Sequence, residues 1–84
     1  MSESEINRIK KVLGNHYSQK IIEQLNKMQI VNSSGNPYSA GSIRKIVNGN
    51  QPNEEIELQI LKIVAKAEKK QFQLAEKRKL LTQS

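Results

Sequence analysis

The sequence predicts an all-α protein, a compact four-helix domain that ends in a long C-terminal helix. Apolar residues recur at three- and four-residue spacings along four segments, the pattern of helices that each bury one face. Glycine, asparagine and proline separate these segments, whereas residues 53–84 contain neither glycine nor proline. With 84 residues, the chain has room for one domain with a modest core.

The first two helices are predicted from their apolar faces and caps. The first covers residues 3–13, with Ser4 as the expected N-cap, and Gly14 and Asn15 end it. Its apolar face consists of Ile6, Ile9, Val12 and Leu13. The second starts after the expected N-cap Ser18, so that Tyr17 and Ile22 occupy the positions of a hydrophobic staple. Its apolar face consists of Ile21, Ile22, Leu25 and Met28, and it is expected to end near Gln29 or Ile30.

The third helix is predicted to start in the same way as the second. Residues 31–37, VNSSGNP, form a loop because their side chains favour turns. Tyr38 and Ser39, followed by Ile43, then repeat the staple-and-cap spacing. We expect a helix of about ten residues that ends at Asn48-Gly49, where glycine can adopt the left-handed conformation. Its apolar stripe consists of Ala40, Ile43, Ile46 and Val47.

The fourth helix is expected to run from the N-cap Asn53 to about Leu81. Its first turn is rich in glutamate, which the helix dipole stabilises. Residues 1–67 then form the domain, and residues 68–84 form a basic extension. The apolar spacing from Ile60 to Leu81 alternates four and three like a heptad seam, interrupted by Gln71 and Arg78. The extension is therefore a dimerising coil, a solvated helix or a frayed end.

The charge of the chain favours a polyanionic partner. The chain has fourteen Lys and Arg residues and eight Glu residues, a net charge of +6. Nucleic acid is therefore the first candidate for a partner, and the alternative is that the charge serves only solubility. There is no cysteine, no aspartate and one histidine, so we expect neither a metal site nor a cofactor nor a small-molecule substrate. No catalytic triad or phosphate-binding glycine loop is present, so an enzyme is not expected. A polar N-terminus without a membrane-spanning run predicts a soluble cytoplasmic protein with no membrane partner.

The second and third helices together form a candidate helix-turn-helix motif. Ser18-Gln19 opens the first of them and Asn48-Gly49 closes the second. In these residues, and in the following ILKIVAKA stripe, the chain resembles the lambda-repressor-like family of DNA-binding domains over roughly residues 5–67. Residues 35–39, GNPYS, are also similar to a segment of the DNA-binding regions of large serine recombinases, without any catalytic domain.

The resemblance implies a set of DNA contacts. Base edges in the major groove would be read by Ala40, Gly41, Ser42 and Lys45, with Arg44 on the flank serving either base or phosphate. Phosphates would be contacted by Gln19 and Asn48. Beside the resemblance, we also expect phosphate contacts from Ser39 and Asn36. The chemistry is compatible, because small residues allow close approach and Lys45 can donate to guanine O6 or N7.

Two features depart from the family pattern. The link between the motif helices, from Gln29 to Tyr38, is several residues longer than the family's tight turn. Glu23 stands where the family has a small residue packed against the recognition helix, so the first motif helix is expected to be rotated.

The expected function is that of a sequence-specific double-stranded DNA-binding protein. A phage or mobile-element transcriptional regulator, acting as a repressor and a homodimer near the bacterial nucleoid, fits a chain with this motif and no other module. The alternative is a non-enzymatic phage-type inhibitor or adaptor whose basic surface binds a nucleoprotein or an acidic partner.

Overall fold

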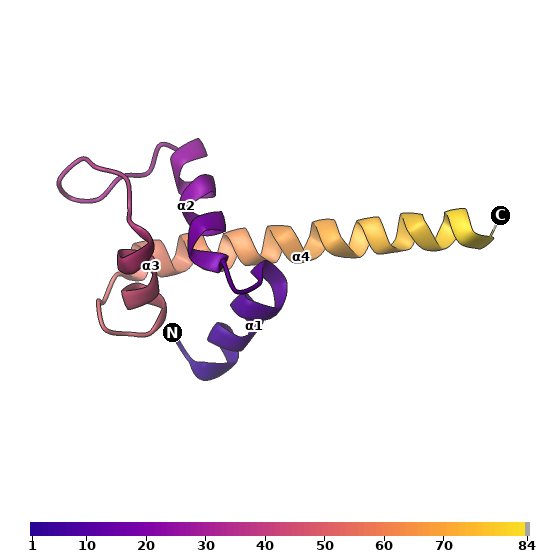
Figure 1. Ribbon diagram of the computed structural model, residues 1–84, viewed down its shortest axis with the longest axis horizontal. Coiled ribbons are helices and arrows are strands. Elements are labelled where there is room, and N and C mark those ends of the chain that lie inside the picture. The colour runs from indigo at the N-terminus through magenta and orange to yellow at the C-terminus, as the bar shows by residue number, and fades with distance from the viewer. Residues whose placement is uncertain (84) are drawn as a thin grey trace.

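Four helices pack around one another, with the last extending well beyond the others (Figure 1). In this computed structural model the helices are α1 (Glu3–Leu13), α2 (Tyr17–Lys27), α3 (Ala40–Val47) and α4 (Glu54–Gln83). The structure describes residues 1–83, with side chains through residue 81, so the last residue of the predicted extension lies outside the described part. The all-α prediction and the long C-terminal helix are confirmed.

The core is formed by one face of each helix. Each apolar periodicity noted in the sequence supplies residues to it, as expected for helices that bury a single stripe. Its buried members are Ile9, Leu13, Tyr17, Ile21, Leu25, Ile43, Ile46, Val47, Ile56, Ile60 and Val64. No strand occurs within residues 1–83.

The N-cap of α1 is Ser2, so the prediction of Ser4 was wrong. The Ser2 hydroxyl accepts the Glu5 backbone N–H at 3.2 Å, and the Glu5 carboxylate accepts the Ser2 backbone N–H at 2.9 Å. This reciprocal capping box satisfies two donors at once, which Ser4 could not do without a glutamate three residues later. The hydrogen bond that the Ser2 backbone N–H donates to the carboxylate is the largest cause of a lowered pKa of Glu5.

The start of α2 also differs from the prediction. Its N-cap is His16, without a side-chain hydrogen bond, and Ser18 lies inside the helix, 1% exposed. Tyr17 is consequently the first helical residue, and the predicted staple with Ile22 is wrong. The helical register that buries Tyr17 together with Ile21 and Leu25 accounts for the earlier start, because burial of these side chains outweighs one capping hydrogen bond.

The start of α3 is as predicted. Ser39 is the N-cap, and its hydroxyl accepts the Ser42 backbone N–H at 3.1 Å. Tyr38 packs against the core at the position before the cap, and Ile43 is fully buried. The helix has eight residues rather than about ten.

Both motif helices end in the same backbone arrangement. After α3, Gly49 has φ 82°, and the Asn50 N–H donates to the Lys45 carbonyl at 2.8 Å. After α2, Gln29 has φ 57°, and the Ile30 N–H donates to the Leu25 carbonyl at 2.9 Å. These are Schellman motifs, and the first confirms the predicted glycine cap. The end of α2 was predicted two or three residues too late.

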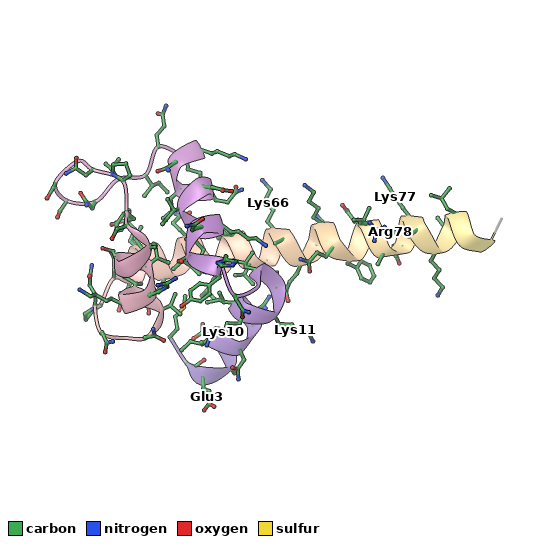
Figure 2. All side chains as sticks on the ribbon, in the orientation of Figure 1. Glu3, Lys10, Lys11, Lys66, Lys77 and Arg78 are labelled. Carbon is green, nitrogen blue, oxygen red and sulfur yellow. The ribbon has the colours of Figure 1, made fainter. Side chains whose placement is uncertain are left out.

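The fourth helix is capped as predicted and continues without interruption for 30 residues. The Asn53 side chain accepts the Ile56 backbone N–H at 3.2 Å and donates to the Tyr38 hydroxyl at 3.4 Å. Every residue from 71 to 81 is exposed. Lys77 and Arg78 lie on this distal part, beyond the other three helices (Figure 2). The extension is therefore helical and exposed in the single chain through residue 81, and its role as a dimerising coil stays a prediction.

Candidate nucleic-acid interface

The predicted reading face of α3 is turned outward. Gly41, Arg44 and Lys45 are exposed, as is the C-cap Asn48, whereas Ala40 and Ser42 are half-buried. On the opposite side of the helix, Ile43, Ile46 and Val47 are completely buried. Because these three side chains fix the rotation of α3 about its axis, the direction of the outward face is set by the core.

The two serines at the start of α3 are engaged with each other. Besides accepting the Ser42 backbone N–H, the Ser39 hydroxyl donates to the Ser42 hydroxyl at 3.1 Å. The Ser39 proton is therefore used within the cap, while the Ser42 proton remains available to an acceptor outside the protein. Of the two hydroxyl groups, that of Ser42 is the better placed to donate to a group outside the protein.

Space at the start of α3 is ample. A Cβ atom at Gly41 would meet only the Ser39 hydroxyl oxygen, at 4.0 Å, and the residue has no left-handed backbone conformation. The fold itself does not require glycine there. A small residue at this point leaves the N-terminal turn of α3 unusually open to close approach from outside.

The surroundings of α3 contain no negative charge along the chain for 30 residues. Between Glu23 and Glu54 there is no carboxylate, and the cations are Lys27, Arg44 and Lys45. The same stretch carries six asparagines and three glutamines, whose amides can donate or accept hydrogen bonds. The stretch itself therefore offers cations and amides to an anion, and the nearest carboxylates along the chain after it are those of the first turn of α4.

The remaining predicted phosphate contacts are divided between two elements. Gln19 is exposed on α2, the helix that packs most extensively against α3. Asn36 lies in the connection of residues 28–39, which projects beyond the helices (Figure 1). The structure thus places Gln19 on the surface of a helix that packs on α3 and Asn36 on the projecting loop.

The long connection between α2 and α3 is organised by Asn32, which the sequence did not single out. Its side-chain oxygen accepts the backbone N–H groups of Ser34 and Asn36, both at 3.0 Å. Its own backbone N–H donates to the Asn36 carbonyl at 2.8 Å, and its carbonyl accepts the Gly35 N–H at 2.9 Å. These hydrogen bonds close the loop into a turn. The connection is nevertheless longer than that of a usual helix-turn-helix, which has three or four residues.

Glu23 is not buried against α3. It is exposed, and the neighbouring Ile22 packs against the core instead. An exposed position keeps this carboxylate in water, whereas burial between two helices would leave it without hydrogen-bond partners. The expected rotation of α2 relative to the family pattern stays a prediction.

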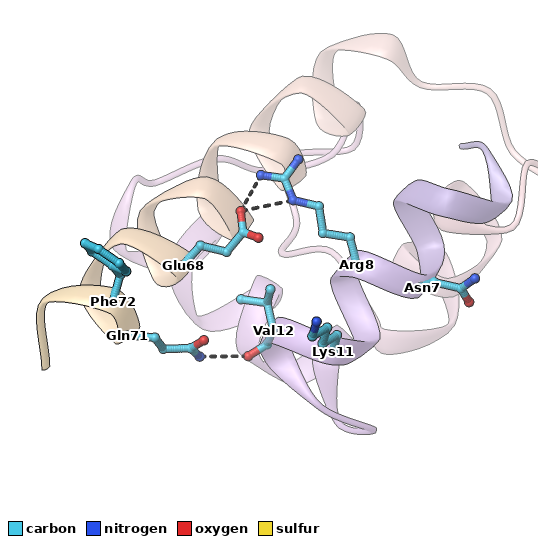
Figure 3. A pocket seen from close by; sticks show the side chains of 7 residues that line it. All are labelled: Asn7, Arg8, Lys11, Val12, Glu68, Gln71 and Phe72. Carbon is cyan, nitrogen blue, oxygen red and sulfur yellow. Dashed lines mark hydrogen bonds and ion pairs between the residues drawn. The ribbon is translucent and has the colours of Figure 1, made fainter. Parts of the chain in front are cut away.

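A hollow of about 750 Å³ between α1 and α4 is bridged by the protein's own side chains (Figure 3). Arg8 forms an ion pair with Glu68, with Nε donating at 3.0 Å, and the Gln71 amide donates to the Val12 carbonyl at 3.0 Å. The Arg8 hydrogen bond holds the pKa of Glu68 below its ordinary value. These contacts fasten α4 to α1, so the hollow is a structural junction.

Comparison with profiles of known protein families, with curated proteins and with solved structures found no match. Among residues 1–83 no helix is long and apolar enough to cross a membrane. Within the same residues no three His, Cys, Asp or Glu side chains are grouped so that they could hold a metal ion.

Proposed function

We propose that the protein binds double-stranded DNA sequence-specifically by inserting α3 into the major groove. One observation carries this proposal: the outward face of α3 combines small residues with two cations and is held in place by three fully buried side chains. A rigid helix with such a face fits the major groove, which admits one α-helix. The likeness of Ser18-Gln19 and Asn48-Gly49 to the lambda-repressor-like family supports the same assignment.

Each exposed residue has a distinct part in the proposed complex. Lys45 donates to guanine O6 or N7, and the Ser42 hydroxyl bonds to a base edge near the start of the helix. Gly41 allows the helix backbone to approach the bases. Arg44 binds a base or a phosphate on the flank, while Gln19 and Asn48 bind phosphates and fix the register of the protein on the duplex.

The proposed biological role is transcriptional repression in a phage or a mobile element. One short recognition helix contacts few base pairs, and each good side-chain contact to a base contributes only about 1 to 3 kcal/mol. Useful specificity then needs two copies of the protein on neighbouring half-sites, about one helical turn apart.

Selection of bound sequences from random duplex DNA tests the proposal. Replacement of Lys45 by alanine is expected to relax preference at one base position and to weaken binding by about 1 to 3 kcal/mol. Lys69→Ala removes an equal charge from the exposed surface of α4 and serves as the matched control. If Lys45→Ala instead weakens binding of all sequences equally, and the salt dependence of the affinity falls by the equivalent of about one phosphate contact, Lys45 binds the DNA backbone. Absence of any selected sequence would contradict the proposal.

A second candidate function is favoured by the distal part of α4. The stretch from 66 to 79 has six basic and two acidic residues, and it carries the exposed apolar side chains Phe72 and Leu74. A non-enzymatic inhibitor or adaptor that binds a nucleoprotein or an acidic partner would use such a surface. DNA affinity without sequence preference, lost at moderate salt, would favour this candidate.

A further inference from the structure

A groove of about 740 Å³ runs between α2 and α4, on a different side of α4 from the junction with α1. Its floor is apolar and consists of Leu13, Met28, Ile63 and Ala67. Leu13 is buried and Ile63 and Ala67 are half-buried, but Met28 is 45% exposed. The floor thus contains a flexible thioether side chain that the protein itself does not cover, a residue type common at surfaces that adapt to partner helices.

Five lysines surround this floor. Lys20 and Lys27 extend from α2, and Lys62, Lys66 and Lys70 extend from α4. All five are exposed, and none forms an ion pair within the described part of the chain. Glu23 is the single carboxylate among the lining residues. The groove therefore carries an excess of four positive charges.

The spacing of the α4 lysines makes this charge excess unfavourable for the isolated protein. Lys62, Lys66 and Lys70 follow one another at intervals of four residues, so each faces the next along the helix. Like charges at this spacing destabilise a helix, whereas an acidic partner in the groove would turn the repulsion into attraction.

The surface continues along α4 past the end of α2. Leu74 lies seven residues after Ala67, on the same face of the helix, and is 49% exposed. Lys77 likewise lies seven residues after Lys70, and Figure 2 shows Lys66 and Lys77 on the side of α4 where α2 lies. From Lys62 to Lys77 the surface is about 22 Å long, which matches a partner helix of about 15 residues.

We propose that this groove binds an acidic amphipathic helix of a partner protein, with apolar side chains on the floor and carboxylates at the lysines. The inference does not depend on DNA binding by α3. Docking of an amphipathic helix into an apolar groove is a common mode of recognition. The lysine rim selects an acidic helix because a basic one would be repelled.

A second copy of this chain is a poor occupant. It also has a net charge of +6, and its α4 would bring the same lysine row into the groove. Duplex DNA fits less well than a helix, because phosphates gain nothing from an apolar floor. In addition, Lys20 and Lys27 lie about 80° to 100° around the α2 axis from Gln19, so the groove opens on a different flank from the proposed phosphate contact.

The test uses the full-length protein and a fluorescein-labelled synthetic peptide of 16 residues, with leucines on one helical face and glutamates elsewhere. Fluorescence anisotropy at low salt is expected to show binding of this peptide. Two control peptides have the same leucines with lysine in place of glutamate, or the same composition in scrambled order. The acidic helix should bind more tightly than either, and added salt should weaken it.

Three variants locate the binding site. Lys66→Glu is expected to weaken the acidic peptide by about fivefold or more, and Met28→Gln should also weaken it. Lys10→Glu makes the same charge change on α1, outside the groove, and should leave the affinity nearly unchanged. All three positions are exposed, and thermal melts establish that the variants are folded.

Three results would overturn the inference. The first is equal binding of the acidic, basic and scrambled peptides. The second is that a DNA duplex competes with the acidic peptide, and that Lys66→Glu weakens binding of the duplex whereas Met28→Gln does not. The groove would then be a phosphate site. The third is self-association in sedimentation that Met28→Gln abolishes, which would make the groove an interface between two copies of the chain.

Discussion

Substitution of Gly41 separates the requirements of the fold from those of DNA binding. A Cβ atom there has only the Ser39 hydroxyl oxygen within 4.0 Å, and the backbone is helical. Gly41→Ala is therefore expected to stabilise the protein by about 0.5 kcal/mol, since alanine loses less backbone entropy on folding. For a domain of this size, the midpoint of thermal unfolding should rise by about 2 to 4 °C.

A larger side chain at the same position should keep the fold and block the proposed complex. Gly41→Leu points into solvent in the free protein, so its thermal midpoint should not fall below that of the unsubstituted protein. In the complex the leucine would stand between the helix and the base edges. Loss of at least tenfold in affinity, about 1.4 kcal/mol, is expected for the selected DNA sequence.

The assay combines thermal unfolding by circular dichroism with DNA binding by anisotropy. Ala75→Leu is the matched control, because it also places leucine at a small exposed position, but on the distal part of α4. Undiminished affinity and sequence preference in Gly41→Leu would refute the close approach of α3 to DNA. A lowered thermal midpoint in Gly41→Ala would refute the steric argument.

Three further predictions concern stability. Gln29→Gly should stabilise the protein by about 1 kcal/mol in urea unfolding, because the left-handed conformation at this helix end is strained for residues with a Cβ atom; an unchanged midpoint would contradict this. Ser39→Ala should destabilise it by about 1 kcal/mol through loss of the cap, whereas Ser39→Gly should cost only a few tenths. Because Arg8 lowers the pKa of Glu68 in the folded state, their ion pair contributes stability above the unfolded pKa of Glu68 and loses it as pH falls through the lower folded pKa. Glu68→Gln should remove this part of the acid dependence, and NMR titration of Arg8→Ala should return the Glu68 pKa to its ordinary value.

The two Tyr-Ser pairs show what the sequence could and could not predict. Both have the same spacing to a later isoleucine, and both predict a cap and a staple. At Tyr38-Ser39 the predicted cap is confirmed, because Tyr38 packs at the edge of the core and Ser39 stays exposed. At Tyr17-Ser18 the tyrosine is buried, and the helix starts at Tyr17, so that Ser18 lies within it. Local patterns predict the helices, and tertiary burial decides their first residue.

The outward face of α3 and the lysine groove also differ in how far the sequence predicts them. The outward face of α3 could be predicted, because it depends only on the periodicity of a single helix. The lysine groove could not, because Lys20 and Lys27 are more than 30 residues from Lys62 and Lys66 along the chain. Their juxtaposition follows from the packing of α2 on α4, and no motif within either helix indicates it. Asn32 is similar, since its organising role depends on how the loop closes.

The unbroken helix α4 fixes the distance between the turn after α3 and the distal end of α4. It begins directly after the turn that follows α3, and its 30 residues rise about 45 Å along a single axis. That length corresponds to about 13 base pairs of duplex DNA. The number of residues in α4 therefore sets the distance between α3 and any group bound near the distal end of α4. Insertion or deletion of residues beyond Gln71 would alter that distance and, by about 100° per residue, the direction in which the bound group faces.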